Sequence, residues 1–283
     1  MTVQEGGARP LKLGKHTLPL RERTLIMGIL NVTPDSFSDG GAFYRKEKAL
    51  EQAERMLKEG ADIIDVGGES TRPGHSSISA REEIARIMPV LEALAGKLDA
   101  PLSVDTSKAE VAAAALKAGA HMINDIWRLT RDPAMAEVAA RFQVPVCLMH
   151  NREQARYRDL LQDILADLQE SIHLALKAGV KEENIIIDPG IGFAKNPAQN
   201  LEVMRRLEEM KTLGYPLLLG TSRKSMIGKV LDLPTDQRVE GTAATVAFGI
   251  IKGADIVRVH DVLPMARVAK MTDAMLKGGR ALA

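Results

Sequence analysis

Polar and charged side chains close the apolar runs of this sequence, and their types suit one kind of chemistry. Arg258 and His260 alternate along the chain, so both point the same way and can donate hydrogen bonds to an anion such as phosphate. Asn31 offers a neutral oxygen of the kind that Mg²⁺ accepts. The carboxylates of Asp105 and Asp188 can accept hydrogen bonds from an amino-substituted heterocycle. Together these residue types indicate an anionic leaving group, a nitrogen-rich ring and a metal ion.

Similar residues recur at the end of every expected strand. In a barrel of parallel strands, the chemistry gathers where the carboxyl ends of the strands meet. Helix capping alone is a poor explanation for eight such ends in succession, although it remains the interpretation for Asp35, Asp132 and Asp261. The ends are Asn31, Gly67–Arg72, Asp105, Asn124 with Asp125, His150 with Asn151, Asp188, Gly220–Lys224, and Arg258 with His260.

Other motifs are weaker or absent. His16, His121 and His173 lack partners at metal-ligand spacing, so a structural or exposed position is expected for each. The sequence holds no HExxH or CxxC motif, which argues against a zinc site held by protein side chains. The glycine-containing segment 220–225 lacks the spacing of a phosphate-binding P-loop.

The elements that must position these side chains alternate along the chain. Eight apolar runs of strand length are each followed by a helical pattern, and a short hairpin around Gly14 precedes them. A doubly wound sheet also alternates in this way, but eight even units without a break favour closure into a (β/α)8 TIM barrel. We therefore expect one domain over residues 1–283. The expected strands are 24–32, 62–66, 101–105, 122–126, 144–149, 184–188, 215–219 and 255–259, and the helices are about 46–60, 79–96, 108–118, 133–142, 157–178, 199–210, a broken region to 252, and 263–276.

Composition narrows the class of protein. The 283 residues carry a formal net charge of +1, which gives no reason to expect binding to nucleic acid or to a membrane surface. No apolar run is long enough to span a bilayer, and the first ten residues lack the apolar stretch of a signal peptide. The single cysteine, Cys147, excludes a disulfide within the chain and fits a buried core position. A soluble cytoplasmic protein is expected.

Seven motifs in order carry a family resemblance. The segments 26–41 (IMGILNVTPDSFSDGG) and 65–74 (DVGGESTRPG) closely resemble the two signatures of the dihydropteroate synthase family. The remaining five are 103–106, 123–126, 188–193, 220–225 and 258–260. The resemblance covers the chain from about Leu11 onward. It implies a transferase of folate biosynthesis that condenses 6-hydroxymethyl-7,8-dihydropterin pyrophosphate with p-aminobenzoate.

The resemblance also implies roles for individual residues. The pterin-binding residues would be Asp105, Asn124, Asp188 and Lys224, with Ile126, Met149, Phe193 and Gly220 as walls. The pyrophosphate would lie against Asn31, Thr71, Arg258 and His260, with Asn31 helping to hold Mg²⁺. The p-aminobenzoate, or a sulfonamide that mimics it, would pack near Phe37, Arg72, Pro73 and Ser225. Asp105, Asp39 and Lys224 are the candidate catalytic residues, with Asp39 in the metal and loop-closure network.

The expected reaction is a displacement with strong dissociative character. Mg²⁺, Arg258 and His260 would stabilise the departing pyrophosphate. Asp105 would shield the ring-stabilised cation, and the aniline nitrogen of p-aminobenzoate would attack without a strong general base.

Two other functions compete with this one. The pterin-binding barrel of a corrinoid methyltransferase shares the slot but has no need of Arg72, Lys224 or the Arg258 and His260 pair. A catalytically silent paralogue would bind pterin without turnover. The family is usually a homodimer, and the apolar segment 243–248 is a candidate interface. Trp127 and Arg128 stand where relatives often carry small residues, so Arg128 either lines the rim or alters access to the mouth.

Overall fold

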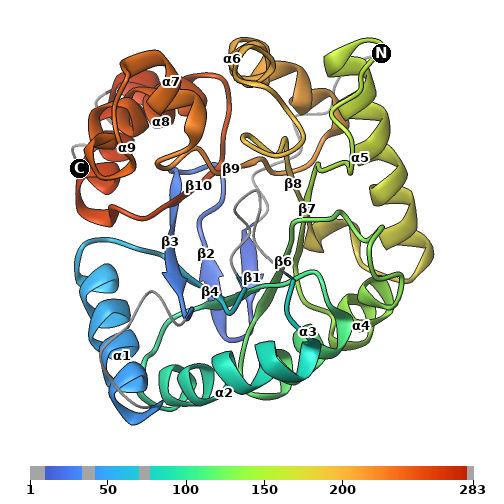
Figure 1. The fold of residues 1–283 in the computed structure, drawn as a ribbon, viewed down its shortest axis with the longest axis vertical. Helices are drawn as coiled ribbons and strands as arrows, with labels where there is room; N and C mark the ends of the chain where they lie inside the picture. Colours follow the sequence, from blue (N-terminus) through green and yellow to red (C-terminus); the bar gives the residue numbers. More distant parts are fainter. Residues whose placement is uncertain (1–9, 34–41, 70–76, 279–283) are drawn as a thin grey trace.

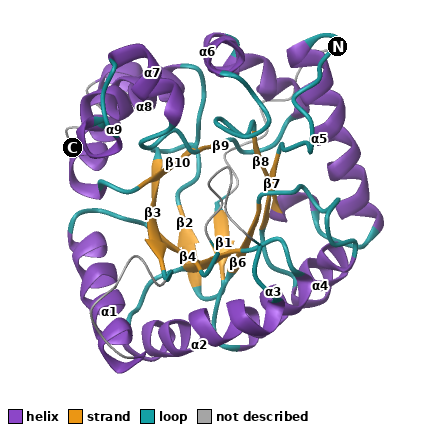
Figure 2. Cartoon of the chain, viewed as in Figure 1, coloured by secondary structure: helices purple, strands orange, loops and turns teal. Residues whose placement is uncertain are grey.

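The computed structural model describes residues 10–33, 42–69 and 77–278, which form a barrel of parallel strands inside a ring of helices (Figures 1 and 2). The barrel strands are β3 (Leu25–Asn31), β4 (Ile63–Gly67), β5 (Leu102–Asp105), β6 (Met122–Asp125), β7 (Val146–Met149), β8 (Ile185–Asp188), β9 (Leu218–Leu219) and β10 (Ile256–Val259). The α-helices are α1 (Ala42–Lys58), α2 (Ala80–Lys97), α3 (Ala109–Lys117), α4 (Ala134–Phe142), α5 (Leu160–Lys177), α6 (Pro197–Arg205), α7 (Ser225–Leu231), α8 (Val239–Ile251) and α9 (Val262–Lys277). Three short 3₁₀ helices, η2 (Glu182–Asn184), η3 (Leu207–Leu213) and η4 (Thr235–Gln237), complete the connections.

The sheet closes on itself. Parallel pairing joins the strands in the order β8-β7-β6-β5-β4-β3-β10-β9. The circle is completed where Ile187 of β8 forms a parallel bridge with Leu217, the residue before β9. The backbone N–H of Ile187 also donates to the carbonyl oxygen of Pro216 at 2.9 Å. The expected (β/α)8 barrel is confirmed, and the carboxyl ends of its strands share one rim.

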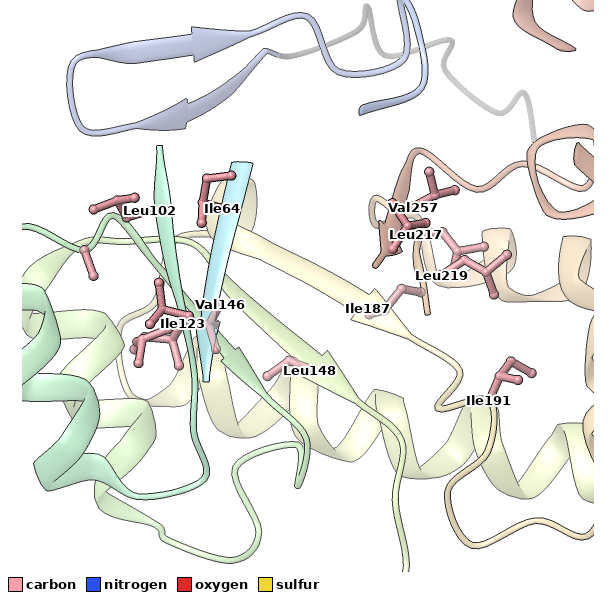
Figure 3. Close-up of a cluster of buried hydrophobic side chains, with 14 of the residues drawn as sticks. Ile64, Leu102, Ile123, Val146, Leu148, Ile187, Ile191, Leu217, Leu219 and Val257 are labelled. Carbon is pink, nitrogen blue, oxygen red and sulfur yellow. The ribbon is translucent and has the colours of Figure 1, made fainter. Parts of the chain in front are cut away.

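Strand alternation divides the buried apolar residues into two layers. Residues such as Ile64, Ile123 and Val257 face the surrounding helices and belong to the larger core (Figure 3). Their neighbours along the strands, such as Ile63 and Ile256, face the barrel interior and form a separate cluster. We call this second cluster the apolar plug, and its members are Leu11, Leu13, Leu20, Leu25, Met27, Ile63, Met122, Cys147, Ile186, Leu218 and Ile256.

The N-terminal hairpin contributes to the plug. Strands β1 (Leu11–Leu13) and β2 (His16–Leu18) pair antiparallel around Gly14, as expected, and lie across the centre of the strand ring in Figure 1. Leu11 and Leu13 are buried against the interior residues at the amino ends of the barrel strands. The hairpin therefore closes one end of the barrel, and the opposite rim carries the strand carboxyl ends.

Helix ends follow the local sequence. Gly60, Gly119 and Gly253 adopt positive φ at the turns into the next strands, as expected. Asp132 also acts at helix starts, because its carboxylate accepts hydrogen bonds from the backbone N–H groups of Ala109 and Ala134. The expectation for Asp261 is wrong: α9 has no side-chain cap bond there, and the carboxylate binds Arg223 at 2.6 and 3.0 Å instead.

Three further observations concern membrane-spanning helices, Cys147 and Asp35. Among the described residues, no helix is both long and apolar enough to cross a membrane. Cys147 is fully buried inside the plug, as expected for a small core residue, and this burial raises the pKa of its thiol. Asp35, the third residue assigned to capping, lies outside the described residues.

Candidate active site

A polar layer lies inside the barrel, directly above the apolar plug. Strand alternation places Asp65, Asp105 and Asn124 on the inward-facing side of the barrel. Asp65 and Asn124 each follow a plug residue by two positions, and Asp105 follows the buried Ser103 by two positions. Parallel register brings Asp105 level with Gly67 on one side and with Asn124 on the other. Arg258 enters the same space from β10, two residues after Ile256 of the plug.

Arg258 joins two buried carboxylates. Its Nε donates to Oδ2 of Asp65 and its Nη2 donates to Oδ2 of Asp105, each at 2.6 Å. Asn124 completes this cluster by donating from Nδ2 to the same oxygen of Asp65 at 3.0 Å. The other carboxylate oxygens of Asp65 and Asp105 are buried without a hydrogen-bond partner among the described residues. Two acceptors therefore remain inside the barrel for donors that a ligand would bring.

In this cluster, burial and the neighbouring charges shift the pKa values of the side chains in opposite directions. Burial raises the pKa of Asp105 to about 7, although Arg258 opposes the shift. Burial alone would lower the pKa of Arg258, but Asp65 and Asp105 beside it raise that pKa above its usual value. Removing either partner would leave a buried charge without compensation, which is strongly destabilising.

A second group of polar residues lies on the opposite side of the mouth. Asp188 ends β8, and its Oδ1 accepts the backbone N–H of Gly190 at 2.7 Å. Lys224 places its Nζ 4.0 Å from the centre of the Phe193 ring, a cation–π contact. Burial raises the pKa of Asp188 to about 6 and lowers the pKa of Lys224 to about 8. Both groups influence each other and Arg258 electrostatically, so the two sides form one site.

His260 is held by a serine that sequence reasoning did not single out. The Ser222 hydroxyl accepts the backbone N–H of His260 at 3.1 Å and pairs with the Nδ1 of the same residue at 3.0 Å. Burial lowers the pKa of His260 to about 3, so the ring is neutral near pH 7. In the tautomer in which the Ser222 hydroxyl donates to Nδ1, the ring hydrogen is on Nε2. His260 can therefore donate one hydrogen bond from Nε2.

The remaining site expectations fall into three groups. Met149 ends β7 in register with Asp188, Ile126 follows β6, and Gly220 follows β9 beside Asp188. Ser225 is exposed at the start of α7, and Asn31 ends β3 in register with Gly67. Phe37, Asp39, Thr71, Arg72 and Pro73 lie outside the described residues.

Two contacts were not anticipated from the sequence. The sequence assigns Asp65 no role beyond membership in the segment 65–74, yet Asp65 is fully buried and binds Arg258. Its signal is a carboxylate at an inward position of an otherwise apolar strand. Arg128 turns away toward α5, where it donates to the carbonyl oxygen of Asp167, to Glu170 and to Ser171. These contacts give Arg128 a structural role in addition to the two roles, lining the rim or altering access, that the sequence left open.

Comparison with known proteins agrees with this geometry. The family model described as "pterin binding enzyme" matches residues 27–260. A relative from Bacillus subtilis, a dihydropteroate synthase, is 60% identical over 269 residues, which cover 93% of this chain and 94% of the relative. A dihydropteroate synthase structure from Clostridium difficile, determined in the presence of pteroic acid, is 53% identical with a TM-score of 0.89 and covers 90% of this chain and 98% of its own. A Yersinia pestis dihydropteroate synthase structure with a sulfonamide drug complex is 45% identical with a TM-score of 0.89 and covers 95% and 100%.

Proposed function

The chain belongs to the dihydropteroate synthases, a family of pterin-binding transferases, and we propose that it condenses 6-hydroxymethyl-7,8-dihydropterin pyrophosphate with p-aminobenzoate to give 7,8-dihydropteroate and pyrophosphate. The observation that carries the proposal is one rim that combines donors for an anion, Arg258 and His260, with acceptors for a ring, Asp188 and Asp105. The corrinoid methyltransferase alternative has no use for the Arg258 and His260 pair.

The pterin is proposed to lie between the two sides of the mouth. Asp188 and the unpartnered oxygens of Asp105 and Asp65 supply acceptors for the amino and ring N–H groups of a pterin. Lys224 and Asn124 supply donors beside them. The proposed walls are Ile126, Met149, Phe193 and Gly220.

The pyrophosphate is proposed to lie at the end of β10. His260 offers its Nε2–H, and Arg258 keeps N–H groups beyond the two that bind Asp65 and Asp105. A planar guanidinium suits this task because it can contact two phosphate oxygens at once. Arg258 stays charged throughout, since its pKa is raised by the same two carboxylates.

The residues present fit a magnesium ion held mainly by substrate. Among the described residues no group of three His, Cys, Asp or Glu side chains could cage a metal. Asn31 provides an oxygen near the end of β3, and a Cβ on Gly67 would come within 3.8 Å of it and 3.7 Å of Asp105 Oδ2. Mg²⁺ commonly binds through one or two protein oxygens together with phosphate and water. When bound, it would neutralise negative charge on the leaving pyrophosphate.

The chain's own residues then divide the work. Arg258 and His260 stabilise the charge that develops on the pyrophosphate as its bond to the pterin methylene breaks. Asp105, a carboxyl next to Arg258, stabilises the cationic ring that remains. The aniline nitrogen of p-aminobenzoate attacks the methylene and releases its proton to water. Ser225, together with Phe37, Arg72 and Pro73, is proposed to hold p-aminobenzoate, and Asp39 to act in the metal and loop-closure network. Sulfonamides would compete at that position.

A homodimer in the cytoplasm is part of the same proposal. Apolar side chains on α7, α8 and α9 are exposed in the single chain, among them Val230, Ile251 and Met275 at 55% exposure or more. Exposed apolar surface concentrated on neighbouring helices is typical of an interface between subunits. The lone, buried Cys147 fits a reducing compartment.

The test is pyrophosphate release by purified protein supplied with the pterin pyrophosphate, Mg²⁺ and p-aminobenzoate. Release that requires all three, with dihydropteroate formed in equal amount, supports the proposal. Omission of p-aminobenzoate and removal of the metal with a chelator are the controls. Tight pterin binding without product would instead identify a catalytically silent paralogue.

A further inference from the structure

The loop after β8 has a backbone that needs to be held in place. Gly190, Gly192 and Ala194 adopt positive φ of 68°, 83° and 45°, a region that is unfavourable for alanine. A Cβ on Gly190 would lie only 1.9 Å from the carbonyl oxygen of His150, so this loop packs directly on the end of β7. Phe193, the residue whose ring meets Lys224, belongs to the same loop.

Lys195 reaches back beneath this loop. Its Nζ donates to the carbonyl oxygens of Gly190 at 3.0 Å and Phe193 at 3.1 Å, and it pairs with Nδ1 of His150 at 2.9 Å. Burial lowers the pKa of Lys195 to about 7, and the ammonium form has one hydrogen for each of the three acceptors. One side chain thus joins both ends of a four-residue turn to the end of β7.

His150 is prepared to accept this hydrogen bond. Its Nε2 lies 3.1 Å from Oδ2 of Asp167 on α5. That carboxylate also accepts Nε of Arg152 at 2.5 Å and lies 3.7 Å from Arg128. Burial lowers the pKa of His150 to about 4, so the ring is neutral, and an ionised Asp167 can only accept. The ring hydrogen therefore belongs on Nε2, and Nδ1 is left as the acceptor for Lys195.

We propose that Lys195 is a positioning residue for the pterin slot: oriented by His150 and Asp167, it fixes the carbonyl groups of Gly190 and Phe193 and thereby the Phe193 ring against Lys224. The inference rests on the proposed function, because it concerns the wall of the same slot. Lys195 contacts the loop backbone and His150, so its proposed effect on the pterin passes through the loop. Its loss frees the Phe193 ring from its position against Lys224.

Calorimetric binding of 6-hydroxymethylpterin, which lacks the pyrophosphate and cannot react, tests this inference. Lys195→Met keeps the length of the side chain and removes the ammonium group, and it should weaken pterin binding about tenfold or more. In turnover, KM for the pterin substrate should rise more than kcat falls. Lys181→Met, the same change at an exposed position, should leave binding unchanged.

A double-mutant cycle separates positioning from general damage to the fold. If Lys195 acts through Phe193, adding Lys195→Met to Phe193→Ala should weaken binding little beyond Phe193→Ala alone. Additive losses would overturn the inference, because an unspecific effect does not depend on Phe193.

A second variant keeps the test decisive should Lys195→Met fail to fold. Asp167→Asn removes the carboxylate that orients His150 and should weaken pterin binding about threefold to tenfold. Its matched control is Glu170→Gln, a carboxylate of the same helix that binds Arg128 but not His150, and binding should not change. Equal binding by Asp167→Asn and the native protein would overturn the inference. Absence of pterin binding by the native protein would overturn the proposed function itself.

Discussion

Two residues along a strand separate the apolar plug of the barrel from its polar layer. On β8, Ile186 is fully buried in the plug and Asp188 faces the mouth, and on β10 the same step leads from Ile256 to Arg258. The plug consists of apolar side chains, and their removal from water stabilises the fold. The polar layer keeps two buried carboxylate oxygens without partners among the described residues. Within one barrel interior, the apolar plug therefore contributes mainly to stability, and the polar layer above it contributes the groups that can bind a ligand.

The largest expected effect comes from removing the cation of the polar layer. Arg258→Met leaves Asp65 and Asp105 without their common partner, and we expect turnover to fall by about a thousandfold or more and stability by about 3–5 kcal/mol at pH 8. The loss of stability should be smaller at pH 5, because unpaired buried carboxyls are protonated there. Pyrophosphate release and urea unfolding at both pH values measure these effects.

A matched arginine provides the control for that experiment. Arg23 binds Asp62 at 2.5 and 2.8 Å on the surface below the barrel, where the arginine side chain is 47% exposed. Arg23→Met should leave turnover within about twofold and reduce stability by less than Arg258→Met does, because the Arg23 side chain is about half exposed and Asp62 keeps its hydrogen bond from the Ile26 N–H. Near-normal turnover by Arg258→Met would contradict the role assigned to the polar layer.

A substitution in the plug should affect the opposite property. Ile186→Ala removes a fully buried side chain, and a loss of about 2–5 kcal/mol in the free energy of unfolding is expected. The protein that remains folded at 15 °C should keep kcat and KM within about threefold of the native values, since Ile186 belongs to the plug and not to the polar layer. A loss of turnover larger than that, measured on fully folded protein, would show that the two levels are not separable.

The sequence predicts which residues lie at the rim of the barrel, but not which side chains contact one another there. Alternation and strand ends placed Asp105, Asn124 and Asp188 at the rim, since these follow from local pattern and the barrel topology. The contact of Arg258 with Asp65 joins residues 193 positions apart and exists only because the last strand, β10, pairs with the first barrel strand, β3. Lys195 likewise gains its role from carbonyl groups of an irregular loop, which carry no signal in the sequence.

The exact ends of helices and strands were also not predicted from the sequence in every case. The expected helix 199–210 is instead α6 from Pro197 to Arg205 followed by η3. Asn196 and Gln199 form a reciprocal capping box that fixes the start of α6, a signal present in the sequence but overlooked. The strand expected over 215–219 is only two residues long in β9, partly because Pro216 has no N–H to donate to a ladder.

A substitution in the polar layer is expected to raise stability. Asp188 has its pKa raised to about 6 by burial, whereas an unfolded Asp ionises near its usual pKa of about 4. The folded state therefore loses stability as pH rises from about 4 through 6, because the buried carboxyl must ionise. Asp188→Asn removes this penalty and should stabilise the fold by on the order of 2 kcal/mol at pH 8, with little change at pH 4.

Asp188→Asn should also weaken pterin binding. This combination of higher stability and weaker binding is the opposite of the result expected for Ile186→Ala. The asparagine oxygen can still accept the Gly190 N–H, but the second carboxylate oxygen becomes a donor amide. Pterin binding at pH 8 should weaken at least tenfold. Native protein should show a related loss below about pH 6, as Asp188 becomes protonated. The variant should lack this part of the pH dependence and keep the part that comes from Asp105. Thermal unfolding and calorimetric titration across pH 5–8 measure both outcomes.

The smallest effect on stability and turnover is expected from Cys147, which lies where the apolar plug meets the polar layer. Cys147 belongs to the plug, yet its backbone is in register with Asn124, and the carboxylates of Asp188 and Asp65 add to the burial that raises its thiol pKa. Cys147→Ala should reduce stability by about 1 kcal/mol and leave turnover unchanged, because only a small volume is lost. Native protein should react with a thiol reagent at pH 8 only as fast as it unfolds, since the thiolate cannot form while Cys147 is buried. Rapid labelling of folded protein, with activity lost in proportion, would show that Cys147 belongs to the polar layer and not to the plug.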